Sequence, residues 1–464
     1  MIIIKKMTAK KGNKYDLIVI GGGTAGLRAS LYSASQFYKT ALIDPGILGG
    51  TCLNTGCIPT KAMLHSANLF KQSNNLKKFG IIAPKTEFNF EEIMNHVKKI
   101  IDNGQEHISK SIQNKNLEII SERAVFISRD EIKAGKQKLI GEKFIICTGA
   151  KPRIPALKGI ENVDYFLSDD IINLKKLPSS IIITGGGYIA LEFATFFNSL
   201  GAKVSIIERN ERLLKDIDAE VSEYLKNHYR SIGIIIKTNA EVLELRQDVI
   251  KKVIFTSLDE GTTQSISADE ILIATGRSPN TFGLDLESAG VRQGEKGNIL
   301  INNNLQTSNK KIYAVGDVTG RTPFAHAAKR ESHIALVNAL EGKKEKMNFE
   351  LVPWAIFTNP PIGGVGISEE QAIEKKIKYG ILKALFARAG RATIIDETSG
   401  FVKIIYDKKT KKILGGIIIG PRADDIIHEI VALMNVNGTI IDLRNTIHIH
   451  PTLSEVFEAL KEVD

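Results

Sequence analysis

The sequence predicts an α/β fold with two similar units of strand, glycine loop and helix, followed by a C-terminal α+β region. Each unit opens with a short apolar run fit for a buried parallel strand, and closely spaced glycines and a helical pattern follow at once. The runs and loops are 16–20 with Gly21, Gly23 and Gly26, and 181–184 with Gly185, Gly187 and Ala190. Beyond a charged linker at 342–346, strand-like runs that include 349–357 and several helices indicate an antiparallel sheet with helices.

The second strand of each unit is followed by an acid, some twenty residues after the glycines. Asp44 closes the predicted strand at 40–44, and Glu208 follows the strand at 203–207. Glycines let a pyrophosphate approach the start of a helix, and the acid accepts hydrogen bonds from ribose hydroxyls. The repeat therefore predicts two Rossmann-like dinucleotide-binding domains in one chain.

Two of the three cysteines, Cys52 and Cys57, lie in a glycine-rich stretch at 49–61. In a regular helix, cysteines five positions apart are too distant for a disulfide, which needs Cα atoms roughly 4.4–6.8 Å apart, so this stretch must depart from a regular helix. Pro59 suits a first helical turn, so we expect the pair where a loop becomes a helix. A helix start and the nearby Lys61 favour thiolates. The alternative is a pair of buried structural cysteines.

Composition excludes several classes of protein. Three cysteines in 464 residues do not form a disulfide framework, and no apolar run is long enough to span a membrane. The net charge of +10 comes from dispersed lysines without a nucleic-acid motif, so we expect neither a nucleic-acid nor a membrane partner. The start, 1–14, lacks signal-peptide features and is expected to be a disordered lead-in to a cytoplasmic protein. Cys147, in an apolar run, is expected to be inert core.

Two further stretches carry start signals for helices. Residues 62–114 read as helical, with a capping start at Asn89. Near the end of the chain, His450 precedes Pro451, so it should stand outside a helix that begins near the proline. Glu455 fits a capping box with Thr452. From these residues alone, an ordinary cap and a surface histidine remain an alternative to an acid–base pair.

The stretch at 49–61 resembles the redox-active motif of the class I pyridine nucleotide-disulfide oxidoreductases, the family of dihydrolipoamide dehydrogenase, glutathione reductase and mercuric reductase. The resemblance extends over nearly the whole chain. It implies that Cys52 is the interchange thiol, that Cys57 is the thiolate at the flavin and that Lys61 lies beside the flavin. The tail at 450–455 is similar to that of dihydrolipoamide dehydrogenases, in which the histidine is the base, acts across the dimer interface, and is oriented by the glutamate.

The resemblance also implies two cofactors, a homodimer and four successive domains. Those domains are an FAD-binding part at 1–152, an NAD(P)-binding domain at 153–281, a second FAD-binding part at 282–348 and an interface domain at 349–464. The residues expected to bind FAD are Gly21, Gly23, Gly26, Asp44, Thr51, Lys61, Thr148, Gly149 and Asp317. Those expected to bind NAD are Gly185, Gly187, Ala190, Glu192, Glu208 and Gly276. Glu192 is also expected to pair with Lys61. No metal site is expected.

The substrate is inferred from departures within the family. No cysteine follows Cys147, whereas mercuric reductases carry a C-terminal cysteine pair, and Leu31 stands where glutathione reductases have a substrate-binding arginine. Dihydrolipoamide dehydrogenase with NAD, serving the lipoyl domain of a 2-oxoacid dehydrogenase complex, is therefore expected. Tyr188 and Ala190 resemble the NADPH-using version of the loop, so an NADPH-dependent disulfide reductase similar to glutathione reductase remains an alternative. A flavin-dependent NAD(P)H diaphorase or quinone reductase is another.

Overall fold

The computed structural model describes residues 13–463, which fold into two compact units built from alternating stretches of chain. The first unit combines Met1–Pro59, His96–Arg153 and Arg277–Asn348. The second combines Thr60–Asn95, Ile154–Gly276 and Phe349–Asp464. The predicted lead-in lies outside the described residues except for its last two, and Lys14 already opens the first strand. None of the described helices is long and apolar enough to cross a membrane.

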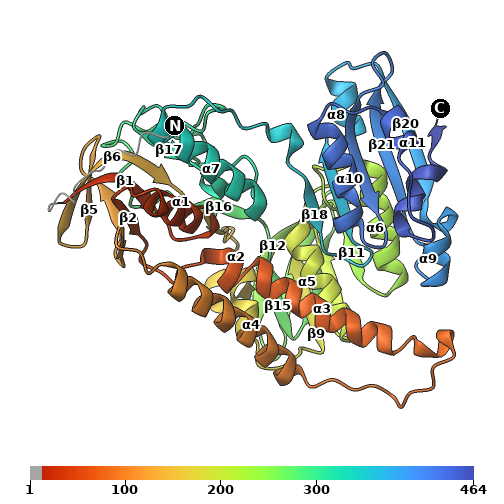
Figure 1. The fold of residues 1–464 in the computed structure, drawn as a ribbon. Coiled ribbons are helices and arrows are strands. Elements are labelled where there is room, and N and C mark those ends of the chain that lie inside the picture. Colours follow the sequence, from red (N-terminus) through yellow and green to blue (C-terminus); the bar gives the residue numbers. More distant parts are fainter. Residues whose placement is uncertain (1–12, 464) are drawn as a thin grey trace. The chain divides into compact units, whose positions relative to one another are not determined.

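The first unit is organised around a seven-stranded sheet in the order β3-β2-β1-β6-β5-β4, with β17 also paired to β6 (Figure 1). Its strands are β1 Lys14–Ile20, β2 Thr40–Ile43, β3 Leu117–Ile120, β4 Ala124–Phe126, β5 Glu131–Ala134, β6 Gln137–Ile146 and β17 Ile312–Ala314. Four strand pairs are parallel, as the buried apolar runs predict: β1 with β2, β1 with β6, β2 with β3, and β6 with β17. Two short strands, β7 (Ala150–Pro152) and β16 (Arg277–Pro279), form a separate antiparallel pair.

The helices of this unit cover the sheet and carry its glycine loop. They are α1 Thr24–Ser35, α2 Gly50–Asn54, the 3₁₀ turn η4 Gly316–Thr319 and α7 Ala325–Glu341. The turn from β1 to α1 requires glycine twice. Gly21 has φ +104°, and a Cβ on Gly26 would lie 1.8 Å from the carbonyl oxygen of Gly21. Helices α1 and α7 lie side by side (Figure 1), and Ser332 Oγ of α7 donates to the Ala25 carbonyl at 2.9 Å.

Two long helices run through stretches of both units, namely α3 (Cys57–Ser73) and α4 (Phe90–Ser111). The predicted helical region at 62–114 is therefore interrupted. After a short 3₁₀ turn, η1 (Leu76–Phe79), Gly80 has φ +75°, and residues 80–89 are not helical. The predicted start at Asn89 is confirmed, because its Oδ1 accepts hydrogen bonds from the backbone N–H groups of Glu91 and Glu92 at 3.0 and 3.3 Å.

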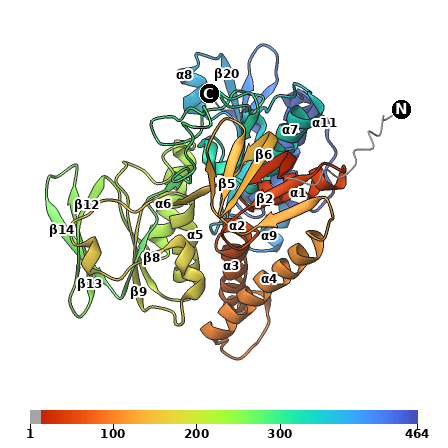
Figure 2. The same ribbon diagram turned by 90° about the vertical axis from the view of Figure 1, so that its left-hand side faces the viewer.

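The second unit contains the repeat of the glycine-loop fold. Its parallel sheet has the order β11-β10-β9-β15-β8, and a small antiparallel sheet, β12-β13-β14, lies beside β8 and β9 (Figure 2). The strands are β8 Phe166–Leu167, β9 Ser180–Thr184, β10 Lys203–Ile207, β11 Ile235–Lys237, β12 Ala240–Gln247, β13 Lys251–Ser257, β14 Thr263–Ala268 and β15 Glu270–Ile273. The helical segments are η2 Ile160–Asn162, η3 Ser168–Asn173, α5 Tyr188–Ser199 and α6 Ala219–Ser231.

The same unit includes a six-stranded antiparallel sheet from the C-terminal region, in the order β18-β19-β22-β21-β20-β23. These strands are β18 Trp354–Ile356, β19 Ile362–Gly366, β20 Tyr379–Leu385, β21 Phe401–Asp407, β22 Ile413–Ile419 and β23 Lys461–Val463. The helical segments are η5 Phe349–Leu351, α8 Glu369–Glu374, η6 Phe386–Arg388, α9 Gly390–Ile394, α10 Ala423–Asn435, α11 Ile440–Asn445 and η7 Leu453–Ala459. The sheet with its helices confirms the predicted α+β region.

One predicted strand of this region, at 349–357, is wrong except at Trp354–Ile356. The run at 349–357 begins with the 3₁₀ turn η5, and only Trp354–Ile356 pairs with β19. The physical reason is Pro353, which has no backbone N–H to donate to a sheet and therefore marks where the strand can begin.

Candidate active site

The cysteine segment departs from a regular helix, as predicted. Gly49 and Gly50 have φ values of +97° and +57°, and they lead into the short helix α2, which ends before Gly56. Cys52 lies half-buried in α2, and Cys57 is the exposed first residue of α3. Pro59 occupies the first turn of α3, where proline is tolerated. The expected loop before the helix is itself a helical turn, since the Gly56 N–H donates to the Thr51 carbonyl at 2.6 Å.

Two amide side chains that the sequence analysis missed hold this segment. Asn54 Nδ2 donates to the carbonyls of Leu48 and Gly50 at 3.1 and 3.0 Å. Gln105 Nε2 on α4 donates to the Leu48 carbonyl and to Asn54 Oδ1 at 2.8 and 2.6 Å. The position of Asn54 between the two cysteines was the available signal, whereas nothing in the sequence links Gln105 to them. Together they fix the backbone on which Cys52 sits.

Lys61 and Glu192 form the predicted pair within the second unit. Lys61 Nζ lies 2.9 and 2.7 Å from the two Glu192 carboxylate oxygens, and Glu192 on α5 is 3% exposed. Phe357 adds two contacts that were not predicted. Its backbone N–H donates to Glu192 Oε1 at 3.1 Å, and its ring centre lies 4.7 Å from Lys61 Nζ. A buried carboxylate is thus paired and hydrogen-bonded, which offsets the cost of burying it.

The first glycine loop has a position that the protein alone does not explain. Gly23 has ordinary extended backbone angles, and no described atom lies within 4 Å of where its Cβ would be. Neither conformation nor packing requires glycine there, so the empty space suits the close approach of a bound group. Asp44 follows β2, and its Oδ2 accepts from the Gly22 N–H, which brings the predicted ribose-binding acid to the loop.

The second glycine loop repeats this geometry. Gly185 has φ +112°, and Gly187 again has extended angles with open space where a Cβ would stand. Ala190, in the position of the third glycine, is fully buried in α5. Glu208 is 7% exposed, and its Oε1 accepts from both the backbone and the side-chain nitrogen of Asn210, the backbone bond being 2.7 Å. Asn210 is a contact that sequence reasoning missed.

The other residues expected at FAD gather in the first unit. Thr148 Oγ1 donates to the Asn280 carbonyl at 2.7 Å, and the Asn280 N–H donates to the Gly149 carbonyl at 2.9 Å. Arg277 Nη2 reaches Thr51 Oγ1 at 3.4 Å. The residue before it, Gly276, has φ +115° and ends the preceding stretch of the second unit.

Asp317 follows β17 in the turn η4, where the sequence predicted it. Burial raises the pKa of its carboxyl, while the charge of Arg277 acts in the opposite direction. The loop is held by Glu331 of α7, which is fully buried. Its two oxygens accept from the Gly316 N–H at 2.6 Å and from Thr322 Oγ1 at 2.8 Å. Glu331 is a further residue that the sequence analysis missed.

His450 and Glu455 form a close pair in the second unit. His450 Nδ1 lies 2.6 Å from Glu455 Oε1, while the Thr452 N–H donates to Glu455 Oε2 at 2.7 Å. The hydrogen bond from His450, followed by that from Thr452, lowers the pKa of Glu455. Glu455 therefore contacts His450 through one oxygen and the Thr452 N–H through the other, which is compatible with both interpretations. The helix after Pro451 is a 3₁₀ helix that starts at Leu453, two residues later than the proline.

Cys147 is buried, as predicted, and burial raises the pKa of its thiol. No group of three or more His, Cys, Asp or Glu side chains among residues 13–463 is arranged to hold a metal ion.

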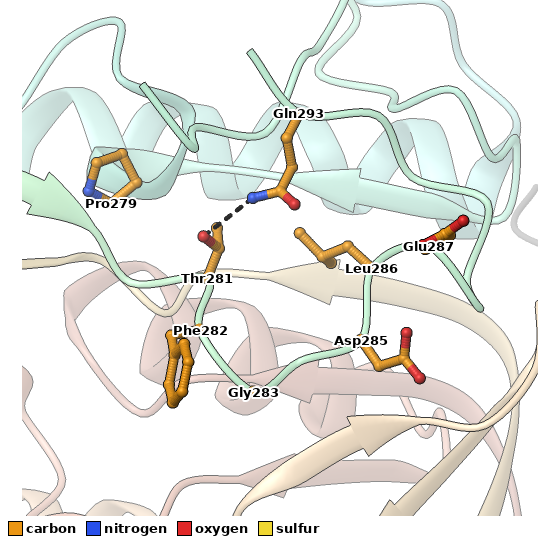
Figure 3. Close-up of a pocket in the computed structure, with 8 residues that line it drawn as sticks. All are labelled: Pro279, Thr281, Phe282, Gly283, Asp285, Leu286, Glu287 and Gln293. Carbon is orange, nitrogen blue, oxygen red and sulfur yellow. Dashed lines mark hydrogen bonds between the residues drawn. The ribbon is translucent and has the colours of Figure 1, made fainter. Parts of the chain in front are cut away.

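A surface pocket of about 420 Å³ follows β16 in the first unit, where Gln293 Nε2 donates to Thr281 Oγ1 at 3.1 Å (Figure 3). Its lining includes none of the predicted site residues. It is therefore not part of the candidate site.

The structure thus assembles the predicted residues in separate groups. The first unit holds both cysteines with the first glycine loop, Asp44, Thr51, Thr148, Gly149 and Asp317. The second holds Lys61 with Glu192, the second glycine loop with Glu208, and His450 with Glu455. The two open glycine positions, each beside a helix start and an acid, are suited to two dinucleotides.

Comparison with known proteins defines the class. Residues 15–332 match the pyridine nucleotide-disulphide oxidoreductase family, and residues 352–460 match its dimerisation domain. The chain therefore belongs to the class I pyridine nucleotide-disulfide oxidoreductases, a family of FAD-binding enzymes. The predicted fold class, with two dinucleotide-binding folds and a C-terminal α+β region, is confirmed.

Relatives of this chain include enzymes with different substrates. It is 33% identical over 447 residues to the mercuric reductase of Lysinibacillus sphaericus, covering 96% of this chain and 81% of that protein. It is 34% identical over 456 residues to the dihydrolipoyl dehydrogenase of Buchnera aphidicola subsp. Schizaphis graminum (strain Sg), covering 97% and 95%. A solved Cu(II) complex of the HOCl-induced flavoprotein disulfide reductase RclA from Escherichia coli matches with a TM-score of 0.86 and 29% identity, covering 96% and 98%. These similarities establish a disulfide oxidoreductase without selecting its substrate.

Proposed function

We propose that the chain is an NAD-linked dihydrolipoamide dehydrogenase that oxidises protein-bound dihydrolipoamide. The observation that carries this proposal is the pair of His450 Nδ1 and Glu455 Oε1, 2.6 Å apart. A thiol substrate is mostly protonated at neutral pH and needs a base, and imidazole titrates in the required range. Because Nδ1 faces Glu455, Nε2 is the nitrogen that takes the proton of the substrate thiol.

The helix start at Cys57 supports dithiol chemistry at the cysteine pair. Cys57 at the start of a 17-residue helix lies where the helix dipole favours a thiolate. Oxidation of the substrate dithiol releases two electrons and two protons. The electrons break a Cys52–Cys57 disulfide through a mixed disulfide at Cys52. One of the two protons ends on the Cys52 thiol and the other on His450, which leaves Cys57 as a thiolate. Bound FAD would supply the acceptor for that electron pair and its route to the nicotinamide.

The residues expected around the cofactors have supporting contacts. The Lys61 ammonium is held by Glu192, so its charge has a fixed position. Glu208 supports NAD over NADP, because a carboxylate accepts from a ribose 2′-hydroxyl and repels a 2′-phosphate. Asn210 orients that carboxylate. The NADPH alternative depends on Tyr188, Ala190 and the positive charge of Arg209, and Ala190 is buried in helix packing.

The substrate assignment is supported by two positions at which the sequence departs from related enzymes. No cysteine follows Cys147, so the C-terminal cysteine pair of mercuric reductases is missing. Leu31 replaces the arginine expected for glutathione. The proposed enzyme is a cytoplasmic homodimer that serves the lipoyl domain of a 2-oxoacid dehydrogenase complex.

The test is a steady-state comparison of FAD-loaded enzyme with four pairs of substrates. They are dihydrolipoamide with NAD, oxidised glutathione with NADPH, Hg(II) with NADPH, and a quinone with NADH. The proposal predicts the highest kcat/KM for dihydrolipoamide with NAD. A higher value for oxidised glutathione, for the metal or for the quinone would replace dihydrolipoamide as the substrate.

A further inference from the structure

The C-terminal segment contains a second histidine whose burial runs against the pattern of its neighbours. The side chain of His448 is 4% exposed, whereas Ile447 and Ile449 are 94% and 79% exposed. An imidazole thus points inward while two isoleucines face outward in the described chain. Burying a polar ring costs free energy unless both its nitrogens are hydrogen-bonded, so this arrangement needs a specific set of partners.

Those partners are two carboxylates from two different elements. His448 Nε2 lies 2.9 Å from Glu429 Oε1 on α10, and Nδ1 lies 3.3 Å from Glu458 Oε1 on η7. The ring also contacts Phe457, with ring centres 6.0 Å apart. A neutral imidazole has one N–H donor and a protonated one has two, so the protonated ring satisfies both carboxylates at once. His448 therefore joins α10 to η7 through the segment that carries His450.

We propose that His448 is the positioning residue of the His450–Glu455 pair, a clamp that fixes the backbone between α11 and η7. The inference rests on the proposed function, in which His450 is the base. The segment at 446–451 is also held by Thr446 Oγ1, which donates to the Asp442 carbonyl at 3.0 Å, and by the contact between His450 and Glu455. A base must be held in place during proton transfer, and a misplacement of about 1 Å can cost on the order of 10²-fold in rate.

The charges around His448 make the clamp electrostatic as well as geometric. Glu429 faces it from α10 and Glu458 from η7, and its own charge acts on Glu455. Removing the ring leaves the carboxylates of Glu429 and Glu458 without the imidazole that contacts them both. The acid–base pair would then sit among uncompensated negative charges, which favour the protonated form of the base.

The experiment compares His448→Gln with His428→Gln in the FAD-loaded enzyme. His428 is a matched control because it lies on α10, the helix that also carries Glu429. Its Nδ1 lies 3.2 Å from the Asp425 carbonyl oxygen, and its ring has no other hydrogen bond among residues 13–463. For His448→Gln we expect kcat for dihydrolipoamide to fall on the order of 10–10²-fold. The acid limb of the kcat/KM profile should move to higher pH, while turnover of NADH with an artificial acceptor stays unchanged. His428→Gln should match the wild type in all three.

A second measurement separates the clamp from the identity of the substrate. Amide hydrogen exchange of the peptide at 446–452 should be faster in His448→Gln than in the wild type or His428→Gln. If exchange and the pH profile are both unchanged, the clamp is refuted. If the wild type does not oxidise dihydrolipoamide, the proposed function is wrong. The clamp is then tested by amide exchange alone, and equal exchange rates in His448→Gln and the wild type would refute it. Should His448→Gln not fold, Glu429→Gln removes one of the two charged partners and should show the same faster exchange.

Discussion

Glu455 illustrates what one side chain can and cannot reveal in a sequence. Its spacing from Thr452 predicts a helix cap, and its place after His450 resembles an acid–base pair. The one carboxylate contacts both the Thr452 N–H and His450 Nδ1. Its depressed pKa means that the stability this carboxylate contributes is present above its unfolded pKa and is lost as pH falls through the lower folded value. His448 had no comparable signal, because its two partners lie ten and nineteen residues away on different elements.

Nucleotide preference depends on Glu208 and on the side chain that orients it. Glu208→Ala should narrow the difference between the KM values for NADH and NADPH, because the 2′-phosphate of NADPH no longer meets a negative charge. Asn210→Ala should narrow it less, since the backbone N–H of residue 210 still binds Glu208 Oε1. KM values for both nucleotides with an artificial acceptor provide the measurement. A wild-type enzyme with a lower KM for NADPH would overturn the assignment of NAD.

Elements were predictable wherever a local pattern determined them. The strand at 203–207 and the cap at Asn89 are present as the sequence indicates. Contacts between distant elements were not predictable. Lys403 of β21 is 5% exposed and pairs with Asp218, the N-cap of α6, at 2.9 Å, and with Glu369 of α8 at 2.6 Å. Nothing local to these residues indicates that they meet.

Removal of Lys403 should weaken the second unit. Lys403→Met leaves Asp218, which is 2% exposed, without its cation, and breaking a buried pair in this way costs about 3–5 kcal/mol in the free energy of unfolding. As a control, Lys110→Met removes an exposed pair with Glu106 and should cost less than about 1 kcal/mol. Urea unfolding of both variants measures the difference. Equal losses would show that the Lys403 contacts do not stabilise the unit.

The contacts of Lys403 also predict how the stability of the second unit depends on pH. Burial opposes the charge on Lys403, but hydrogen bonds from it to Glu369 and Asp218 prevail and raise its pKa. A cation whose pKa rises on folding contributes its stability fully below the unfolded value of about 10.4 and loses it only as pH rises through the folded value. The destabilisation of Lys403→Met relative to wild type should therefore be constant between about pH 6 and 9 and shrink in strong alkali. A difference that disappears near neutral pH would contradict the assignment.

Stretches that are far apart in the sequence are assembled into the same unit of the fold. Four successive domains were predicted, and they remain a prediction. The fold described for residues 13–463 consists of two units, each assembled from three separate stretches. The strand β17 joins the sheet of the first unit beside β6, although the entire repeat of the glycine-loop fold lies between them in the chain. Local patterns identify the stretches, but only long-range pairing determines which of them share a sheet.

The proposed homodimer can be tested by exchanging subunits. If His450 serves the cysteines of the partner subunit, mixing inactive Cys52→Ser chains with inactive His450→Gln chains should restore activity. Each mixed dimer then has one intact site and should approach about half of the wild-type rate, because a missing acid–base group costs about 10²–10⁴-fold and silences the other site. Mass spectrometry monitors the exchange. Mixed dimers that remain inactive would refute the shared site.

The central claim, that thiol oxidation proceeds through the cysteine pair of a flavin enzyme, is tested most directly by Cys52→Ser. Two rates are measured on the same FAD-loaded preparation: NAD reduction by dihydrolipoamide, and NADH oxidation by an artificial acceptor. The first requires the Cys52 thiol, whereas the second requires only the cofactor sites. The account predicts that Cys52→Ser abolishes the first rate and retains the second. A variant that oxidises dihydrolipoamide as fast as the wild type would contradict it.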